Sequence, residues 1–329
     1  MTADAPRKVI FKNFQSPGDL VMLLYGIASL HESHPGKFLT DVNCPVKDIF
    51  HANPLITQLD PAADDVTVVD ADYPLINKSN DYPVRFVDAF GVAIGEKLGV
   101  AITTTKFQGV LHITPDERAW LSSVHEILNK DVPYWILNAG HKYDYTAKAW
   151  SFARYQELVD RFPNVWFVQV GAKEHEHPTL KGPNLIDMVG RTDVRQMIRL
   201  VYNSFGVISG VSFPMHLAYA VPAHPRFKRA SRANITIAGG REPAHWEQGP
   251  NHQFLHTCGI LSCCQAGGCW KSRVVPIEDS DNKNGNLCTR PVVLDSGQWI
   301  GECMALITVD DVAKQIERYM AYLDYEPKF

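Results

Sequence analysis

Residues 7–35, RKVIFKNFQSPGDLVMLLYGIASLHESHP, decide the prediction of the fold. The run RKVIFKNF is rich in residues that favour β-strands, and the turn QSPGD separates it from a run with apolar residues at helical spacing. Pro35 stops this second run. A strand, a glycine-containing turn and a helix in this order are typical of the first unit of a parallel βαβ fold. The stretch therefore predicts an α/β protein.

The same alternation recurs along the chain. Further strands are expected at KFLTDV, LITQLD, VTVVDA, YWILNAG, NVWFVQVGA, FGVISG and NITIAGG. Helices are expected at VRFVDAFGVAIGEKLG, TPDERAWLSSVHEIL, SFARYQELVDRF, TDVRQMIRLVYNS, SFPMHLAYAV and TVDDVAKQIERYMAYLDY. We predict two Rossmann-like domains, residues 1–128 and 129–329, with a ligand cleft between them at the carboxyl ends of the strands. No G-x-G-x-x-G motif follows a strand, which argues against an NAD-dependent dehydrogenase.

Composition and charge exclude several classes of protein. The 329 residues are 45% hydrophobic and 21% charged, with a formal net charge of −4, so the basic excess typical of nucleic-acid binding is missing. The N-terminal sequence has no apolar core of a signal peptide. No apolar run approaches the roughly 20 residues of a membrane span. We therefore expect a cytoplasmic protein with reduced thiols.

Asp19 is the candidate residue of the first βα turn. It lies in the first turn of the predicted helix, where a carboxylate complements the helix dipole. At the mouth of a cleft it would instead act as a general base toward an attacking hydroxyl group, with Gly18 allowing close approach of a substrate. The sequence leaves both interpretations open.

The second half offers a candidate anion site. Lys148 follows a predicted strand and would meet a phosphate group as a point charge, or lie solvated in a loop. A strand ending at Gly210 runs into a helix whose first N–H groups, near Ser212, Phe213 and Met215, would bind an anion. His216 lies one turn further, as a packed or as a catalytic histidine.

Six of the seven cysteines lie between residues 258 and 303, where the strand–helix alternation is lost. CGILSCCQAGGCWKSR holds four of them, and LCTRP and ECM hold the others. Four thiolates in tetrahedral arrangement suit zinc or iron, and the candidate ligands are Cys264 (or Cys263 in its place), Cys269, Cys288 and Cys303. Buried apolar cysteines and redox-sensing thiols are the alternatives. Cys44 and Cys258 are expected to be packed.

KEHEHP, residues 173–178, is a weaker candidate site. His175 and His177 would bind a metal ion, or Glu174 or Glu176 would meet a ribose hydroxyl group. The position after a predicted strand favours the second interpretation.

Three stretches, in their order and spacing, resemble glycosyltransferase family 9, the ADP-heptose heptosyltransferases. They are PGDLVMLLYGIASLHESHP, NAGHKYDYTAKAWSFARYQELVDRF and ISGVSFPMHLAYAV, within about residues 8 to 240. The tail GGREPAHWEQGPNHQFLHTCGILSCCQAGGCWKSR, with LCTRP and ECM, resembles the bacterial autotransporter heptosyltransferases, which carry a cysteine-bound iron.

The resemblance implies a GT-B fold, with the nucleotide-sugar donor in the C-terminal domain and the acceptor over the N-terminal domain. Asp19 falls on the catalytic acidic position, Lys148 on the phosphate-contacting lysine, Thr192 on a segment near the nucleotide and His216 on the histidine of the anion-binding helix. We expect inverting transfer from a nucleotide-sugar, ADP-heptose favoured, to a hydroxyl group of a protein or glycan, without a divalent ion in catalysis. The cysteines would hold structural iron or zinc, with iron favoured.

One departure from the family pattern keeps other functions open. The family has a DSG or DTG turn before the second helix, and this chain has GVSF, where Val211 accepts no side-chain hydrogen bond. A catalytically silent binding protein that uses its cysteine segment to engage a partner is the alternative. A nucleic-acid enzyme with a zinc finger is disfavoured by the acidic balance.

Overall fold

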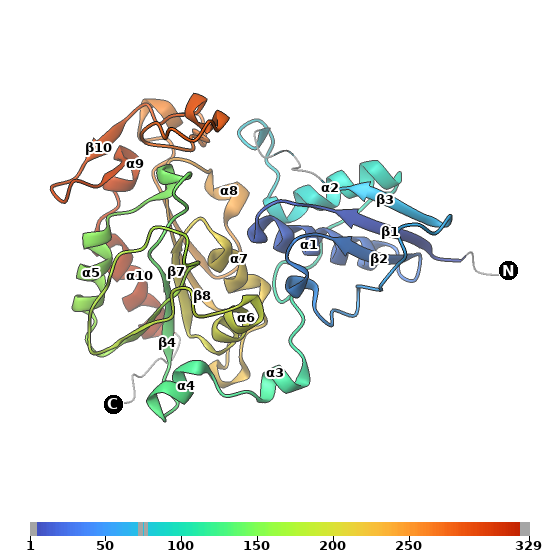
Figure 1. Ribbon diagram of the computed structural model, residues 1–329, viewed down its shortest axis with the longest axis horizontal. Coiled ribbons are helices and arrows are strands. Elements are labelled where there is room, and N and C mark those ends of the chain that lie inside the picture. Colours follow the sequence, from blue (N-terminus) through green and yellow to red (C-terminus); the bar gives the residue numbers. More distant parts are fainter. Residues whose placement is uncertain (1–4, 72–74, 76–77, 323–329) are drawn as a thin grey trace.

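The computed structural model describes residues 5–71, 75 and 78–322, which form two lobes (Figure 1). The N-terminal lobe holds a three-stranded parallel sheet of order β2-β1-β3. Its strands are β1 (Arg7–Lys12), β2 (Phe38–Asn43) and β3 (Val66–Asp70), and its helices are α1 (Pro17–Ser33) and α2 (Phe86–Leu98). Gly99, in the left-handed conformation, ends α2 as a C-cap.

The predicted strand LITQLD is wrong. Residues 55–60 form no strand and touch the sheet through one isolated bridge, Thr40 to Ile56. The side chain of Asp41 accepts the backbone N–H of Leu59 at 3.0 Å, so a carboxylate replaces the sheet partner of this segment.

The C-terminal lobe holds a six-stranded parallel sheet of order β6-β5-β4-β7-β8-β9. Its strands are β4 (Tyr134–Asn138), β5 (Trp166–Gln169), β6 (Leu185–Asp187), β7 (Gly206–Gly210), β8 (Ala233–Gly239) and β9 (His252–His256). Its long helices are α5 (Phe152–Arg161), α6 (Val194–Asn203), α7 (Phe213–Ala220) and α10 (Val309–Tyr322). Residues 323–325, predicted to extend α10, lie outside the described residues.

The predicted helix TPDERAWLSSVHEIL is two short helices, α3 (Pro115–Ala119) and α4 (Ser123–Leu128), between the lobes. Thr114 accepts the N–H of Glu117 to cap the first, and Ser122 accepts the N–H of His125 to cap the second. The chain breaks between them because Ser122 acts as a new N-cap. The predicted domain boundary at 128/129 falls at the end of α4.

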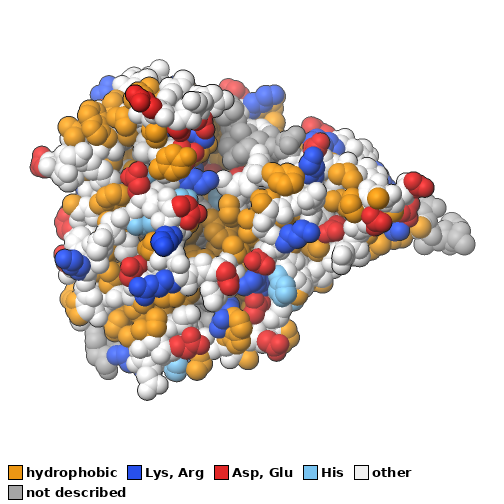
Figure 2. All heavy atoms as spheres, viewed as in Figure 1, with side chains coloured by type: hydrophobic (Ala, Val, Ile, Leu, Met, Phe, Trp, Pro, Cys, Tyr) orange, Lys and Arg blue, Asp and Glu red, His pale blue; other side chains and the backbone are white. Residues whose placement is uncertain are grey.

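The lobes pack through α1 and α7, and both helices belong to one hydrophobic cluster. The hydroxyl group of Tyr25 on α1 donates to the carbonyl oxygen of Tyr219 at 3.4 Å. Among the described helices, none combines the length and apolar character that crossing a membrane requires. Figure 2 shows acidic, basic and apolar side chains mixed across one face of the molecule.

The cysteine segment lies at one end of the C-terminal lobe (Figure 1). It contains short turns and a two-stranded antiparallel sheet, β10 (Pro291–Val293) with β11 (Trp299–Gly301), and α9 (Glu302–Ala305) follows directly. The side chain of Asn80, from the N-terminal lobe, donates to the Gly268 carbonyl at 2.9 Å and accepts the Gly268 N–H at 2.8 Å. This segment therefore contacts both lobes.

Candidate active site

Asp19 lies in the first turn of α1 and is 5% exposed. Its Oδ2 accepts the backbone N–H of Ser16 at 3.1 Å, so the carboxylate caps the helix and lies in the first turn, where it also complements the helix dipole. Its charge also acts on Lys148 and Glu247 of the C-terminal lobe, favouring the charged lysine and the neutral glutamic acid. The capping acid thus lies at the junction of the two lobes.

Gly18 brings the lobes together at this point. A Cβ atom at Gly18 would lie 2.7 Å from Cδ2 of His216. The space that the sequence suggested for a substrate is therefore occupied by a side chain of the other lobe.

His216 is packed, 5% exposed, with Nδ1 at 3.0 Å from the hydroxyl group of Tyr219. Burial, and then the charge of Lys148, lowers the pKa of His216 to about 3. The imidazole is therefore neutral near pH 7 and supplies no positive charge to a phosphate group.

Lys148 ends a short 3-10 turn that follows β4. Its Nζ lies 3.0 Å from Oε1 of Glu242 and donates to the carbonyl oxygen of Val211 at 3.2 Å. Burial, and then the charge of Arg241, lowers the pKa of Lys148 to about 7. The lysine is thus held in the site by partners from two neighbouring strand ends, unlike a solvated loop lysine.

The segment GREPAHWE, residues 240–247, supplies three functional candidates that the sequence analysis missed: Arg241, Glu242 and Glu247. Arg241 pairs with Glu242, and both are largely buried. Glu247 ends the short helix α8 (Ala244–Glu247), 4% exposed. A signal was present, because charged residues directly after a buried strand lie at the ligand-binding edge of a parallel sheet.

Glu247 lies with its Oε2 atom 3.9 Å from Nε2 of the neutral His216. Burial raises the pKa of Glu247 to about 7, against the opposing effect of Lys148. The site therefore holds the buried carboxyl group of Asp19 from the N-terminal lobe and four groups from the C-terminal lobe. These are the buried Glu242, Glu247 and Arg241 and the half-buried Lys148.

The start of α7 offers an anion fewer free backbone N–H groups than the sequence suggested. Ser212 is the N-cap, Pro214 carries no N–H, and the N–H of Met215 donates to the Ser212 carbonyl at 3.0 Å. Only the backbone N–H groups of Ser212 and Phe213 are left to meet an anion there.

Thr192 lies away from this cluster. It precedes Asp193, the N-cap of α6, and follows β6, which is separated from β4 by β5. The hydrogen bond and the ion pair of Lys148 go to Val211 and Glu242 and not to Thr192. Its placement near a nucleotide stays a prediction.

KEHEHP packs against the loop after β4. Oε2 of Glu176 lies 3.6 Å from Nε2 of His141, and Nε2 of His177 lies 3.0 Å from the Ala172 carbonyl. Within residues 5–71, 75 and 78–322, no three side chains of His, Cys, Asp or Glu are grouped as metal ligands, and this applies to His175 and His177.

None of the seven cysteines forms a disulfide. Among the described residues, the six cysteines of residues 258–303 make no group of three placed to hold a metal ion, so the predicted four-cysteine site is not shown. Burial raises the pKa of Cys303 to about 11, and Cys269, Cys288 and Cys264 add to the shift in that order. Burial also raises the pKa of Cys269, and the charges of Cys263 and Cys288 add to this shift.

Cys258, expected to be an ordinary packed residue, belongs to this group, and burial raises its pKa to about 12. Cys44 is buried in the core, as predicted. The thiol of Cys264 is engaged with the carbonyl oxygens of Thr257 and Leu261, at 3.4 and 3.5 Å.

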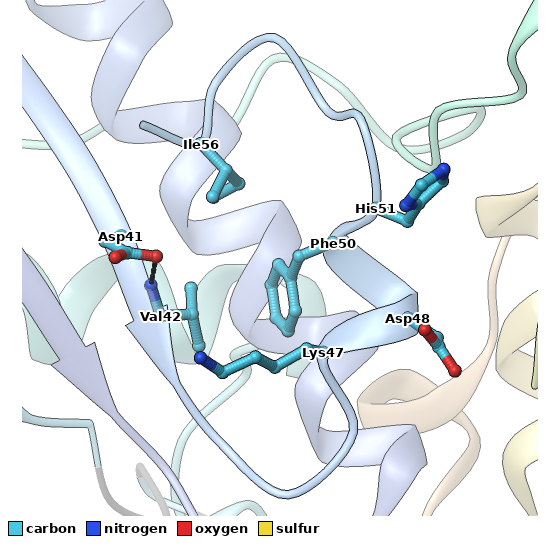
Figure 3. A pocket seen from close by; sticks show the side chains of 7 residues that line it. All are labelled: Asp41, Val42, Lys47, Asp48, Phe50, His51 and Ile56. Atoms are coloured by element: carbon cyan, nitrogen blue, oxygen red, sulfur yellow. Dashed lines mark hydrogen bonds between the residues drawn. The ribbon is translucent and has the colours of Figure 1, made fainter. Parts of the chain in front are cut away.

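A hollow lies on the N-terminal lobe, beside β2, with a volume of about 240 Å³. Phe50 points into it between Ile56 and Lys47 (Figure 3). Asp41, Val42, Asp48 and His51 complete its lining. It shares no residue with the cluster around Lys148.

Comparisons with known proteins place the fold. No protein-family model and no curated protein sequence matches the chain. A glycosyltransferase of family 9 from Veillonella parvula matches at 12% identity and TM-score 0.60, over 98% of this chain and 99% of that one. The ADP-heptose lipopolysaccharide heptosyltransferase II of Escherichia coli matches at 11% identity and TM-score 0.56, over 97% and 100%.

TibC of enterotoxigenic Escherichia coli, an iron-containing dodecameric glycosyltransferase, matches at 16% identity and TM-score 0.62, over 98% of this chain and 78% of that one. Identities of this size support similarity of fold only. The chain therefore has the fold of the GT-B heptosyltransferases of glycosyltransferase family 9, with two lobes built on parallel sheets.

Proposed function

We propose that the chain is an inverting glycosyltransferase that moves a sugar from a nucleoside diphosphate to an acceptor hydroxyl group. One observation carries the proposal: the buried carboxylate of Asp19, next to the Gly18–His216 contact between the lobes, faces the half-buried Lys148 of the other lobe and favours its charged form. The chemistry needs a base at the acceptor and a cation at the leaving diphosphate, and these two residues supply them.

The reaction follows from the charges. As the bond from the anomeric carbon to the diphosphate breaks, negative charge grows on phosphate oxygens, and Lys148 and Arg241 would stabilise it. The sugar becomes oxocarbenium-like, and the acceptor hydroxyl attacks from the opposite side. Asp19 takes the proton of that hydroxyl as the new bond forms, since the free hydroxyl has a pKa far above 7. No divalent ion is needed in these steps.

The donor we favour is ADP-heptose. The first support is the fold, because TibC and the heptosyltransferase WaaC of Escherichia coli are known in complex with ADP-heptose or a fluorinated analogue. The second is the sequence resemblance around Asp19, Lys148 and His216. The acceptor we propose is a hydroxyl group of a protein or a glycan.

The test combines donor binding with turnover. Wild-type protein is screened against nucleotide sugars by thermal shift, because a ligand of the folded state raises its stability. Release of ADP from ADP-heptose is then measured with serine-containing peptides and glycans as acceptors. Asp19→Asn is expected to lower turnover by about 10²- to 10⁴-fold and to keep donor binding. Lys148→Gln is expected to weaken donor binding.

Glu317→Gln, on the exposed side of α10, is the matched control and should change neither measurement. Near-normal turnover by Asp19→Asn would refute the assignment of the base. Wild-type protein that binds ADP-heptose and releases no ADP with any acceptor would be the catalytically silent binding protein instead.

We also propose that the cysteine segment holds a structural iron or zinc ion, with iron favoured by the resemblance. The fit to the donor set is chemical, because thiols suit iron and zinc. The charge of Cys263 acts on Cys269 and Cys288, and the charges of Cys269 and Cys288 act on Cys303. The carbonyl contacts of Cys264 favour Cys263 as the fourth ligand. A metal would join β10, α9 and the turn at Gly267 in a segment with little regular structure. The unpaired thiols also support the proposed cytoplasmic location.

A further inference from the structure

The carboxyl group of Glu247 has a buried oxygen without a partner. The residue is 4% exposed, and its Oε2 has no hydrogen bond among the described residues. Nε2 of His216 is 3.9 Å away from it, beyond hydrogen-bond distance. A buried acceptor without a partner is costly, so native proteins keep one mainly where a ligand, a water or a reaction uses it.

The position of Glu247 is built by contacts of its own short helix. On one side Trp246 stacks on Phe86 of the N-terminal lobe, with ring centroids 4.8 Å apart. On the other side, His245 Nε2 lies 2.7 Å from the carbonyl oxygen of Ser79, also in the N-terminal lobe. Both neighbours of Glu247 in this helix therefore contact the lobe that carries Asp19.

The charged groups around Glu247 limit what it can bind. Asp19 faces it from α1, Lys148 from the turn after β4 and Arg241 from the segment after β8, while His216 of α7 is neutral. Two carboxyl groups repel a phosphate group, and two cations repel a cationic ligand. A hydroxyl group is neutral, donates to a carboxylate and accepts from a carboxylic acid.

We propose that Glu247 binds a hydroxyl group of the transferred sugar. This inference rests on the proposed function: the diphosphate lies against Lys148 and Arg241, and the sugar lies between them and Asp19. Glu247 thus discriminates among sugars, and takes part in binding rather than in proton transfer.

The experiment compares two ligands on three variants. Dissociation constants of ADP and of ADP-heptose are measured for wild type, Glu247→Ala and Glu247→Gln by calorimetry. In Glu247→Ala the ratio of the ADP constant to the ADP-heptose constant should fall about 10- to 100-fold, as for a lost hydrogen bond to a charged group. The ADP constant itself should change less than about threefold. Glu247→Gln should retain part of the ratio, since its amide oxygen still accepts.

Unliganded stability separates binding from a structural role. Because Oε2 has no partner, Glu247→Gln should melt at or above the wild-type temperature. An unchanged ratio of the two dissociation constants in Glu247→Ala would overturn the inference. It would also be overturned if Glu247→Gln melted at a lower temperature and lost affinity equally for ADP and ADP-heptose. Failure of wild type to bind ADP-heptose would sink the proposed function, and this inference with it. Glu317→Gln should match wild type throughout.

Discussion

The contact at Gly18 gives a prediction that two alanine substitutions test against each other. Gly18→Ala places a Cβ atom 2.7 Å from Cδ2 of His216, closer than such atoms approach in proteins. The ring is buried and bonded to Tyr219, so it cannot swing away freely. Overpacking of this kind costs about 1–3 kcal/mol. Against this cost, alanine stabilises the fold by about 0.4–1 kcal/mol, because it restricts the unfolded chain and favours the helix more than glycine does.

Gly91 in α2 is the matched control, because a Cβ atom there would lie 3.4 Å from Cγ2 of Ile102, an ordinary contact. Gly91→Ala should therefore raise the free energy of unfolding by about 0.4–1 kcal/mol. Gly18→Ala should lower it by up to about 2.6 kcal/mol, the overpacking cost less the gain from alanine, and urea unfolding resolves this difference in sign. Equal stabilisation by both substitutions would show that the lobes do not meet at Gly18 as described.

Three further results are expected. Burial lowers the pKa of His252 to about 3, below its unfolded value near 6.5, so its contribution to stability is lost as pH falls through that window. Between pH 6.5 and 5 the free energy of unfolding should fall by about 2 kcal/mol through His252. His252→Gln should therefore make urea unfolding less dependent on pH. An unchanged pH dependence in this variant would contradict the assignment. Asn80→Ala removes both hydrogen bonds to Gly268 and should lower the free energy of unfolding by about 1–2 kcal/mol. Proteolysis of residues 78–85 should become faster, and an unchanged rate of cleavage would count against this contact. Cys288→Ser should lose bound iron or zinc, measured by elemental analysis, and should melt at a lower temperature. Cys44→Ser, the control, should keep the metal. Wild-type protein purified without metal would rule the site out.

Local patterns in the sequence predicted most of the fold. The strand, turn and helix of residues 7–33 are present, since their apolar spacing matches the period of each element. β6 and β9 were missed because they are short and carry polar residues, as in HQFLH, so neither shows a clear strand pattern. LITQLD was overpredicted because its apolar residues pack beside β2 without joining the sheet.

The site was predicted in part for a related reason. Asp19 and Lys148 follow strands in recognisable turns, and the sequence pattern brings both to the edge where parallel strands end. Glu242 and Glu247 lie in the region where the alternation is lost, and their burial depends on contacts with the other lobe, such as the Trp246–Phe86 stack. Contacts between residues more than a hundred positions apart leave no local period in the sequence.

The stack of Trp246 on Phe86 couples an optical probe to the distance between the lobes. The indole is 1% exposed, and it is the immediate neighbour of Glu247. Any separation of the lobes wide enough to admit a ligand would expose this indole to water and shift its fluorescence emission to longer wavelength. Stopped-flow fluorescence, with Trp246→Phe to identify the signal, would then time the opening of the protein in the same solution in which catalysis is followed.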